Sequence, residues 1–257
     1  MTDAGHGTTG HSDADHSDAD HSDAGTAVAE PRWGLGDALL AFAASMFTSL
    51  AALLVYLVAG GDDEGVGVTV VTLAASWVGM VGVTVWASRS KGAGSLADDF
   101  GFRLEGRDVP RGLVVGLACY FLLVPAVVLL VEAFFHDVNV SQQSEELTAD
   151  ASGWSMVLLG PFLVVGAPVA EEVFFRGLLQ RSLVRRIGVA PGIVLAAVLF
   201  GLAHAMVDID GWTVVALVLA LSAFGAVLGI LAHRTRRLGT SLVAHGVFNL
   251  VTVLILA

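Results

Sequence analysis

Charged residues are scarce in this chain of 257 residues. They make up 14% of it, whereas a typical soluble domain contains about 25%. Hydrophobic residues make up 55% and the mean hydropathy is +0.77, so the composition excludes an ordinary soluble protein and favours a membrane protein. Cysteine is scarcer still: Cys119 is the only one, which excludes an intrachain disulfide.

Basic residues are also few, 13 against 24 acidic ones, and no nucleic-acid partner is expected. The first 30 residues hold seven of the acidic residues and no basic one. A five-residue repeat in this stretch spaces four histidines evenly: His6, His11, His16 and His21. We predict that residues 1–32 form a disordered, acidic, histidine-containing tail, which lacks the basic start and apolar core of a signal peptide. Weak metal binding by this tail is left open.

Long apolar segments recur through the rest of the chain, and most have 18 or more residues, enough for a helix that crosses about 30 Å of hydrocarbon. They lie near residues 39–58, 66–87, 113–131, 154–183, 193–206, 212–232 and 242–257. The fourth is interrupted by Pro161 and Pro168, and the fifth is short. Residues 33–257 are therefore predicted to form an all-α, polytopic transmembrane bundle of about seven helices in a lipid bilayer.

Twelve of the 13 basic residues lie before the first apolar segment or at the ends of every second one, and cytoplasmic loops are the connections that collect lysine and arginine. They follow the second, fourth and sixth segments, as Arg89, Lys91, Arg103, Arg107, Arg111, Arg181, Arg185, Arg186, Arg234, Arg236 and Arg237, and Arg32 precedes the first. The pattern predicts a cytoplasmic N-terminus and an external C-terminus. The alanine- and valine-rich composition is typical of a prokaryotic plasma-membrane protein.

One basic residue, Arg176, interrupts an apolar segment together with Glu171 and Glu172. Charged side chains inside a membrane are expensive and usually functional. Glu172 and Arg176 are four residues apart, so on a helix they share a face and can pair. Glu171 points about 100° away, which leaves one carboxylate without a counter-charge.

Two later apolar segments supply polar partners. Phe200 and His204 are four residues apart in one, and His245 and Asn249 are four apart in the other. Each pair shares a helix face. Burying such groups without mutual satisfaction costs several kcal/mol, so we expect them to converge with Glu171 and Glu172 in a polar intramembrane cavity.

Signatures of other intramembrane proteases are lacking. The chain has no HExxH segment, the helical zinc-protease motif. The segment GLGD, Gly34 to Asp37, is similar to the motif of aspartyl intramembrane proteases. A second membrane aspartate to share its proton is missing, so we expect Asp37 at the start of the first helix instead.

The motifs EExxxR (Glu171, Glu172, Arg176), FxxxH (Phe200, His204) and HxxxN (His245, Asn249), in this order on successive apolar segments, resemble those of the CPBP family. This family joins type II CAAX prenyl endopeptidases with bacteriocin-processing and immunity-type (Abi) membrane proteins. The resemblance covers about residues 150–257. It implies an intramembrane CAAX-type metalloendopeptidase whose cavity opens to the cytoplasm and whose substrate is a membrane protein or peptide, such as a CAAX-type protein or a leader peptide.

The resemblance also suggests roles for the six residues in peptide hydrolysis. Glu171 with His204 would activate a water, His245 with Asn249 would stabilise the oxyanion, and Glu172 with Arg176 would support them. A set of Glu171, His204, His245 and Asn249 could instead surround Zn²⁺. Zinc-dependent and metal-free mechanisms are both left open, because histidine and carboxylate suit either role.

Other classes of function fit the same membrane charges. A catalytically silent scaffold or a bacteriocin-immunity protein of the same fold is the main alternative. A secondary transporter is disfavoured, because the two halves of the chain show no convincing repeat and the polar membrane residues all lie in the C-terminal half.

Overall fold

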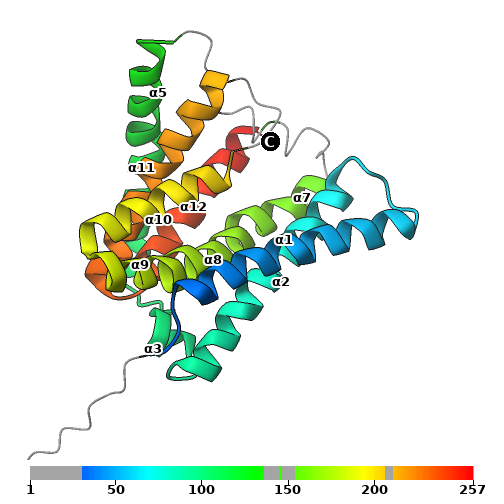
Figure 1. The fold of residues 1–257 in the computed structure, drawn as a ribbon. Coiled ribbons are helices and arrows are strands. Elements are labelled where there is room, and N and C mark those ends of the chain that lie inside the picture. The colour runs from blue at the N-terminus through cyan, green and yellow to red at the C-terminus, as the bar shows by residue number, and fades with distance from the viewer. Residues whose placement is uncertain (1–30, 136–139, 141–144, 146–153, 206–210, 257) are drawn as a thin grey trace, which may run out of the picture. The chain divides into compact units, whose positions relative to one another are not determined.

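The structure is a computed structural model that describes residues 31–135, 140, 145, 154–205 and 211–256. In these residues every regular element is helical and no strand occurs, so the predicted all-α class is confirmed. The predicted tail lies almost wholly outside the described residues, and its disorder stays a prediction. Figure 1 shows the helices of the unit formed by residues 31–257.

The first two helices, α1 (Leu35–Val58) and α2 (Val66–Lys91), form an antiparallel hairpin (Figure 1). Polar groups join them inside the apolar surface. The Ser45 and Ser76 hydroxyl oxygens lie 2.8 Å apart, and the Thr48 hydroxyl donates to the Ala75 carbonyl at 2.7 Å. Gly79 allows the close approach, because a Cβ there would lie 2.5 Å from the Ala44 carbonyl oxygen. Small residues and interhelical hydrogen bonds are how helices associate in lipid.

Two longer helices contain wide, π-helical turns next to prolines. The first runs through α4 (Asp108–Ala118), η1 (Cys119–Leu123) and α5 (Val124–Glu132). The second runs through α7 (Trp154–Pro161), η2 (Phe162–Gly166), α8 (Ala167–Glu171), η3 (Glu172–Leu179) and α9 (Gln180–Ile187). Both η1 and η2 end just before a proline, whose ring clashes with the carbonyl four residues earlier. The helix therefore widens there instead of ending.

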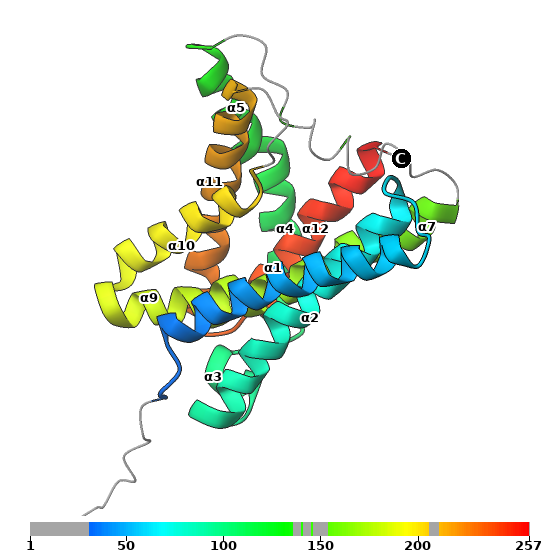
Figure 2. The same cartoon turned by 45° about the vertical axis from the view of Figure 1, so that its right-hand side comes forward.

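The last three helices are α10 (Val189–Ala203), α11 (Gly211–Thr235) and α12 (Gly239–Leu256). Figure 2 shows α4 beside α12, and α10 packs on α11. Gly112 and Gly116 face α12, where a Cβ on Gly116 would lie 2.6 Å from the Ala244 carbonyl oxygen. The position of α12 is thus fixed by glycines on α4.

All seven predicted apolar segments fall within helices, apart from a few terminal residues. Among the described residues, four helices are long and apolar enough to cross a membrane: α1, α2, the helix from Asp108 to Glu132, and α11. The helices α10 and α12 are apolar but shorter. Apolar side chains such as Phe47 and Val58 remain 72% and 90% exposed. The chain is therefore an integral membrane protein whose outer surface faces lipid.

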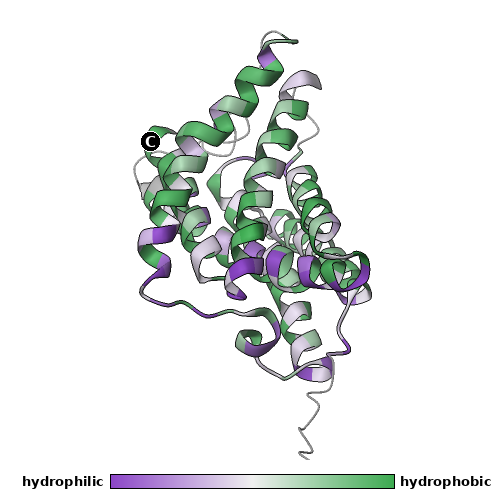
Figure 3. Cartoon of the chain, turned by 90° about the vertical axis from the view of Figure 1, so that its left-hand side faces the viewer, coloured by the Kyte–Doolittle hydropathy of each residue, from purple (hydrophilic) through white to green (hydrophobic). Residues whose placement is uncertain are grey.

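Hydrophilic residues gather toward one end of the bundle (Figure 3). Here the Asp99 carboxylate, in α3 (Leu96–Phe100), accepts hydrogen bonds from the Trp33 indole at 3.0 Å, the Ser88 hydroxyl at 2.6 Å and the Ala93 amide at 3.0 Å. Burial raises the pKa of Asp99, but these hydrogen bonds outweigh it and hold the pKa below its ordinary value. The Arg185 guanidinium stacks on Trp33 at 3.7 Å.

The aspartate of the GLGD segment lies at this same end, in the first turn of α1, as expected. One Asp37 oxygen accepts the Gly34 amide at 2.9 Å, and the other lies 2.5 Å from the Lys91 ammonium. The carboxylate therefore caps α1 and joins it to the end of α2.

Candidate active site

Glu172 and Arg176 form a buried ion pair on η3. The Arg176 Nη1 and Glu172 Oε1 atoms lie 3.0 Å apart, and the two side chains are 2% and 0% exposed. The predicted pairing is therefore present, although this stretch winds as a π-helix. The guanidinium also lies 4.2 Å from the Phe200 ring centroid and donates to the Gly225 carbonyl at 3.4 Å. Its charge is thus compensated by a carboxylate and an aromatic face.

His245, on α12, is held by the same carboxylate. Its Nδ1 lies 3.1 Å from Glu172 Oε1. An ionised carboxylate only accepts hydrogen bonds, so Nδ1 carries the hydrogen and donates it to Glu172. The edges of two rings, Phe200 and Phe224, pack at 5.8 Å and 5.5 Å from the imidazole. The Nε2 atom of neutral His245 is left with a free lone pair.

His204 ends α10 and has the same tautomer for a different reason. Its Nδ1 lies 2.8 Å from the Phe200 carbonyl oxygen. A carbonyl cannot donate, so this nitrogen is the one that carries hydrogen. The side chain is 26% exposed, and its Nε2 lone pair is also free.

Glu171 lies between the two imidazoles. Its Oε2 atom is 3.7 Å from the Nε2 of His204 and 3.7 Å from the Nε2 of His245. These distances are too long for direct hydrogen bonds, and Oε2 is buried with no hydrogen-bond partner among the described residues. Because three acceptor atoms converge, a proton, a water or a cation is needed between them.

Asn249 lies one turn beyond His245 on α12. Its Nδ2 donates one hydrogen to the Leu163 carbonyl, in η2, at 2.8 Å. The other amide hydrogen is not used by this bond. The described contacts thus join five of the six predicted residues to one another, whereas Asn249 is tied to the long helix at Leu163.

The donor set suits a zinc ion in its chemistry. In the described part of the chain no group of three or more His, Cys, Asp or Glu side chains stands ready to hold a metal. The buried Glu171 Oε2 nevertheless faces two imidazole nitrogens, each on a ring whose other nitrogen donates to a carboxylate or a backbone carbonyl. Metal-bound histidines are oriented in this way. The predicted zinc set, Glu171, His204, His245 and Asn249, stays a proposal.

Helix α11 contributes to the site although sequence reasoning named no residue from it. Phe224 packs against His245 and stacks on Phe248 at 4.3 Å. The Gly225 carbonyl accepts from Arg176, and a Cβ at Gly225 would lie 3.1 Å from the Phe200 ring. The spacing of Gly225 and Gly229 was the available signal, because small residues four apart allow close helix packing.

Comparison with known proteins gives one family. Residues 153–251 match the family described as type II CAAX prenyl endopeptidase Rce1-like. This range contains all six predicted site residues. No curated protein and no solved structure matches the chain.

Proposed function

We propose that this chain, whose residues 153–251 belong to the Rce1-like family of type II CAAX prenyl endopeptidases, hydrolyses peptide bonds of membrane-associated substrates with a water activated at Glu171 and His204. The family is one of membrane proteases. The observation that carries the mechanism is the buried Glu171 Oε2 atom, which faces the Nε2 atoms of two histidines.

A water between Glu171 and His204 would be the nucleophile. It can donate one hydrogen to Glu171 Oε2 and the other to the His204 Nε2 lone pair. As its oxygen bonds to the substrate carbonyl carbon, one of these groups takes the proton and the carbonyl π electrons move to the oxygen. The proton then passes to the leaving amine as the C–N bond breaks. The Phe200 carbonyl accepts from Nδ1 of His204 and so keeps the Nε2 atom directed at the water.

The negative charge that develops on the carbonyl oxygen needs donors. Asn249 can offer its second amide hydrogen, because Leu163 uses the other. His245 can donate from Nε2 only when it is an imidazolium, with its Nδ1 still donating to Glu172. Arg176 in turn pairs with the same Glu172 oxygen at 3.0 Å. The buried pair therefore supports the oxyanion site through His245.

Zinc, when bound, would be held by Glu171, His204, His245 and Asn249, and would polarise the carbonyl or acidify the water. The chain's own residues would still orient the imidazoles, through Phe200 and Glu172. The alanine- and valine-rich composition favours a prokaryotic plasma membrane as the setting, and the basic connections favour a cytoplasmic N-terminus and an external C-terminus.

The test is cleavage of a panel of fluorogenic membrane peptides by purified protein in bilayers. Wild type should cleave at least one peptide, and Glu171→Gln and His204→Ala should each abolish cleavage. Glu132→Gln, at the end of α5 and outside the site, is the matched control and should retain it. Loss of activity with chelator and its return with Zn²⁺ would assign the metal-dependent route.

Folded wild-type protein that cleaves no member of a broad panel would refute the protease. The catalytically silent scaffold or immunity protein would then be the better account. Cleavage that survives both site substitutions would instead show that the reaction takes place elsewhere.

A further inference from the structure

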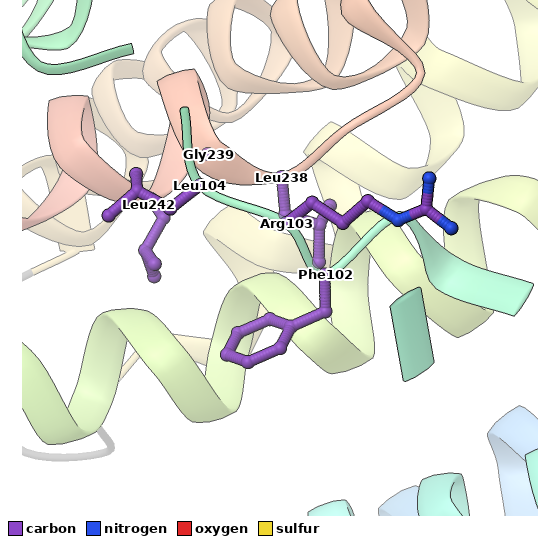
Figure 4. Close-up of a pocket in the computed structure, with 6 residues that line it drawn as sticks. All are labelled: Phe102, Arg103, Leu104, Leu238, Gly239 and Leu242. Carbon is purple, nitrogen blue, oxygen red and sulfur yellow. The ribbon is translucent and has the colours of Figure 1, made fainter. Parts of the chain in front are cut away.

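A small apolar pocket lies at the start of α12 (Figure 4). Six residues line it: Phe102, Arg103, Leu104, Leu238, Gly239 and Leu242. It encloses about 50 Å³ and is partly open to its surroundings. Pockets for small-molecule ligands usually measure roughly 300–1,000 Å³. The space therefore suits a single side chain better than a whole ligand.

The wall formed by the loop after α3 is held in place by hydrogen bonds. The Leu238 amide donates to the Gly101 carbonyl at 2.8 Å, which joins the loop to the residue before α12. Arg237 pairs with Glu105 at 3.0 Å and with Asp108 at 2.8 Å. These contacts thus fix the loop against the start of α12 before any ligand arrives.

The pocket and the candidate active site share one face of the same helix. Leu238, Leu242, His245 and Asn249 follow one another at intervals of four, three and four residues. This spacing places them in one stripe. Leu242 is about one turn, roughly 5 Å along the axis, from His245. Leu238 also packs against Val173, the residue after Glu172.

The lining selects an apolar group. Phe102 and Leu104 are 37% and 60% exposed at the rim, so an apolar occupant would cover surface that is unfavourable in water. The one charged side chain in the lining, Arg103, pairs with Asp98 on its outer side. The rim therefore presents no uncompensated charge to an ionic ligand.

From these observations we infer that the pocket receives one bulky apolar side chain of the peptide substrate, close to the bond that is cut, and so contributes to cleavage specificity. The inference rests on the proposed function. It names the part of the substrate that the surface near His245 recognises.

The single native cysteine makes a direct test available. Cys119 is 4% exposed, so Leu104→Cys adds an accessible thiol to a chain that otherwise offers little reaction. The background carries Glu171→Gln, which prevents turnover, and the protein is held in lipid nanodiscs. The rate of maleimide labelling is measured in the presence of either of two peptides, which differ at one position that holds leucine or glycine. The leucine peptide should protect the thiol at about tenfold lower concentration.

Val109→Cys is the matched control, because Val109 is 50% exposed and does not line the pocket. Its labelling should not respond to either peptide. The inference would be overturned if the peptides slowed labelling of the Leu104→Cys and Val109→Cys thiols equally. It would also be overturned if the leucine and glycine peptides protected equally, or if neither protected. Phe102→Cys repeats the test on the same pocket if Leu104→Cys does not fold.

The cleavage assay on wild type keeps the two proposals separate. Side-chain-dependent protection without any cleavage would retain the pocket as a peptide-binding site and refute the protease. Cleavage without side-chain-dependent protection would retain the protease and refute the pocket as a binding site for the substrate side chain.

Discussion

Replacement of Arg176 by leucine should lower the unfolding temperature sharply, because it leaves the Glu172 carboxylate in the protein interior without its counter-charge. The two groups lie 3.0 Å apart and are 2% and 0% exposed. Removal of one partner of a buried pair costs about 3–5 kcal/mol. For a protein of this size, 1 kcal/mol corresponds to about 2–4 °C. The unfolding temperature should therefore fall by roughly 6–20 °C.

The double variant Glu172→Leu/Arg176→Leu should be more stable than the single one. It removes both charges and fills the space with apolar atoms, which is close to neutral in other buried pairs. The remaining cost comes from His245, whose Nδ1 hydrogen loses its acceptor. A buried donor without a partner costs about 1–3 kcal/mol. Stability should thus recover in part, whereas cleavage should stay absent because His245 is no longer oriented.

Unfolding can be followed with a thiol-reactive dye on heating, since Cys119 is the only cysteine and is buried. The measured quantity is the temperature at which this thiol becomes reactive. If the double variant unfolds at or below the temperature of Arg176→Leu, the pair is not the source of the stability. If the double variant cleaves as wild type does, the pair has no part in orienting His245.

Two further predictions concern packing and acid stability. Gly116→Val should lower the stability by about 1–3 kcal/mol and reduce cleavage, because its Cβ would lie 2.6 Å from the Ala244 carbonyl oxygen and push α12 away. Gly82→Ala is the control: a Cβ there meets nothing within 4 Å, so stability and cleavage should stay unchanged. The lowered pKa of Asp99 means that this carboxylate stabilises the fold above its unfolded pKa of about 3.9 and that the stability is lost as pH falls through its lower folded pKa. In thermal scans at pH 7, Asp99→Asn should therefore unfold at a lower temperature than wild type. In scans at acidic pH, its unfolding temperature should fall by less than that of wild type. The exposed Asp98→Asn should match wild type at both pH values.

The fold could be predicted largely from hydropathy. In lipid, a helix satisfies its backbone hydrogen bonds within one segment, so each apolar segment was expected to be helical. The boundaries differ by a few residues, as at α10, which ends at Ala203 with His204 as its cap. The π-helical turns were not predicted. Two of them, η1 and η2, depend on how a continuing helix accommodates Pro125 and Pro168, which spacing alone does not determine.

The candidate site was predictable in its members but not in its contacts. Spacing shows which residues share a helix face, so it could pair Glu172 with Arg176. It does not show which helices are neighbours. The hydrogen bond between His245 and Glu172, 73 residues apart, therefore appeared only in the structure. The contribution of α11 is a similar case, because it consists of the Gly225 carbonyl and the Phe224 ring, and neither is a titratable group that would mark a site in the sequence.

The adjacent glutamates differ in what surrounds them, and the proposed function gives them different chemical roles for this reason. Glu172 is fully buried, and one oxygen serves both Arg176 and His245, so its charge is committed to holding the site together. Glu171 is 16% exposed and faces lone pairs instead of donors. Glu172 and Arg176 cancel each other, which leaves the Glu171 charge to stabilise whatever positive charge forms beside it. In the proposed reaction, a proton taken from water by His204 would supply that charge, and so would a metal ion.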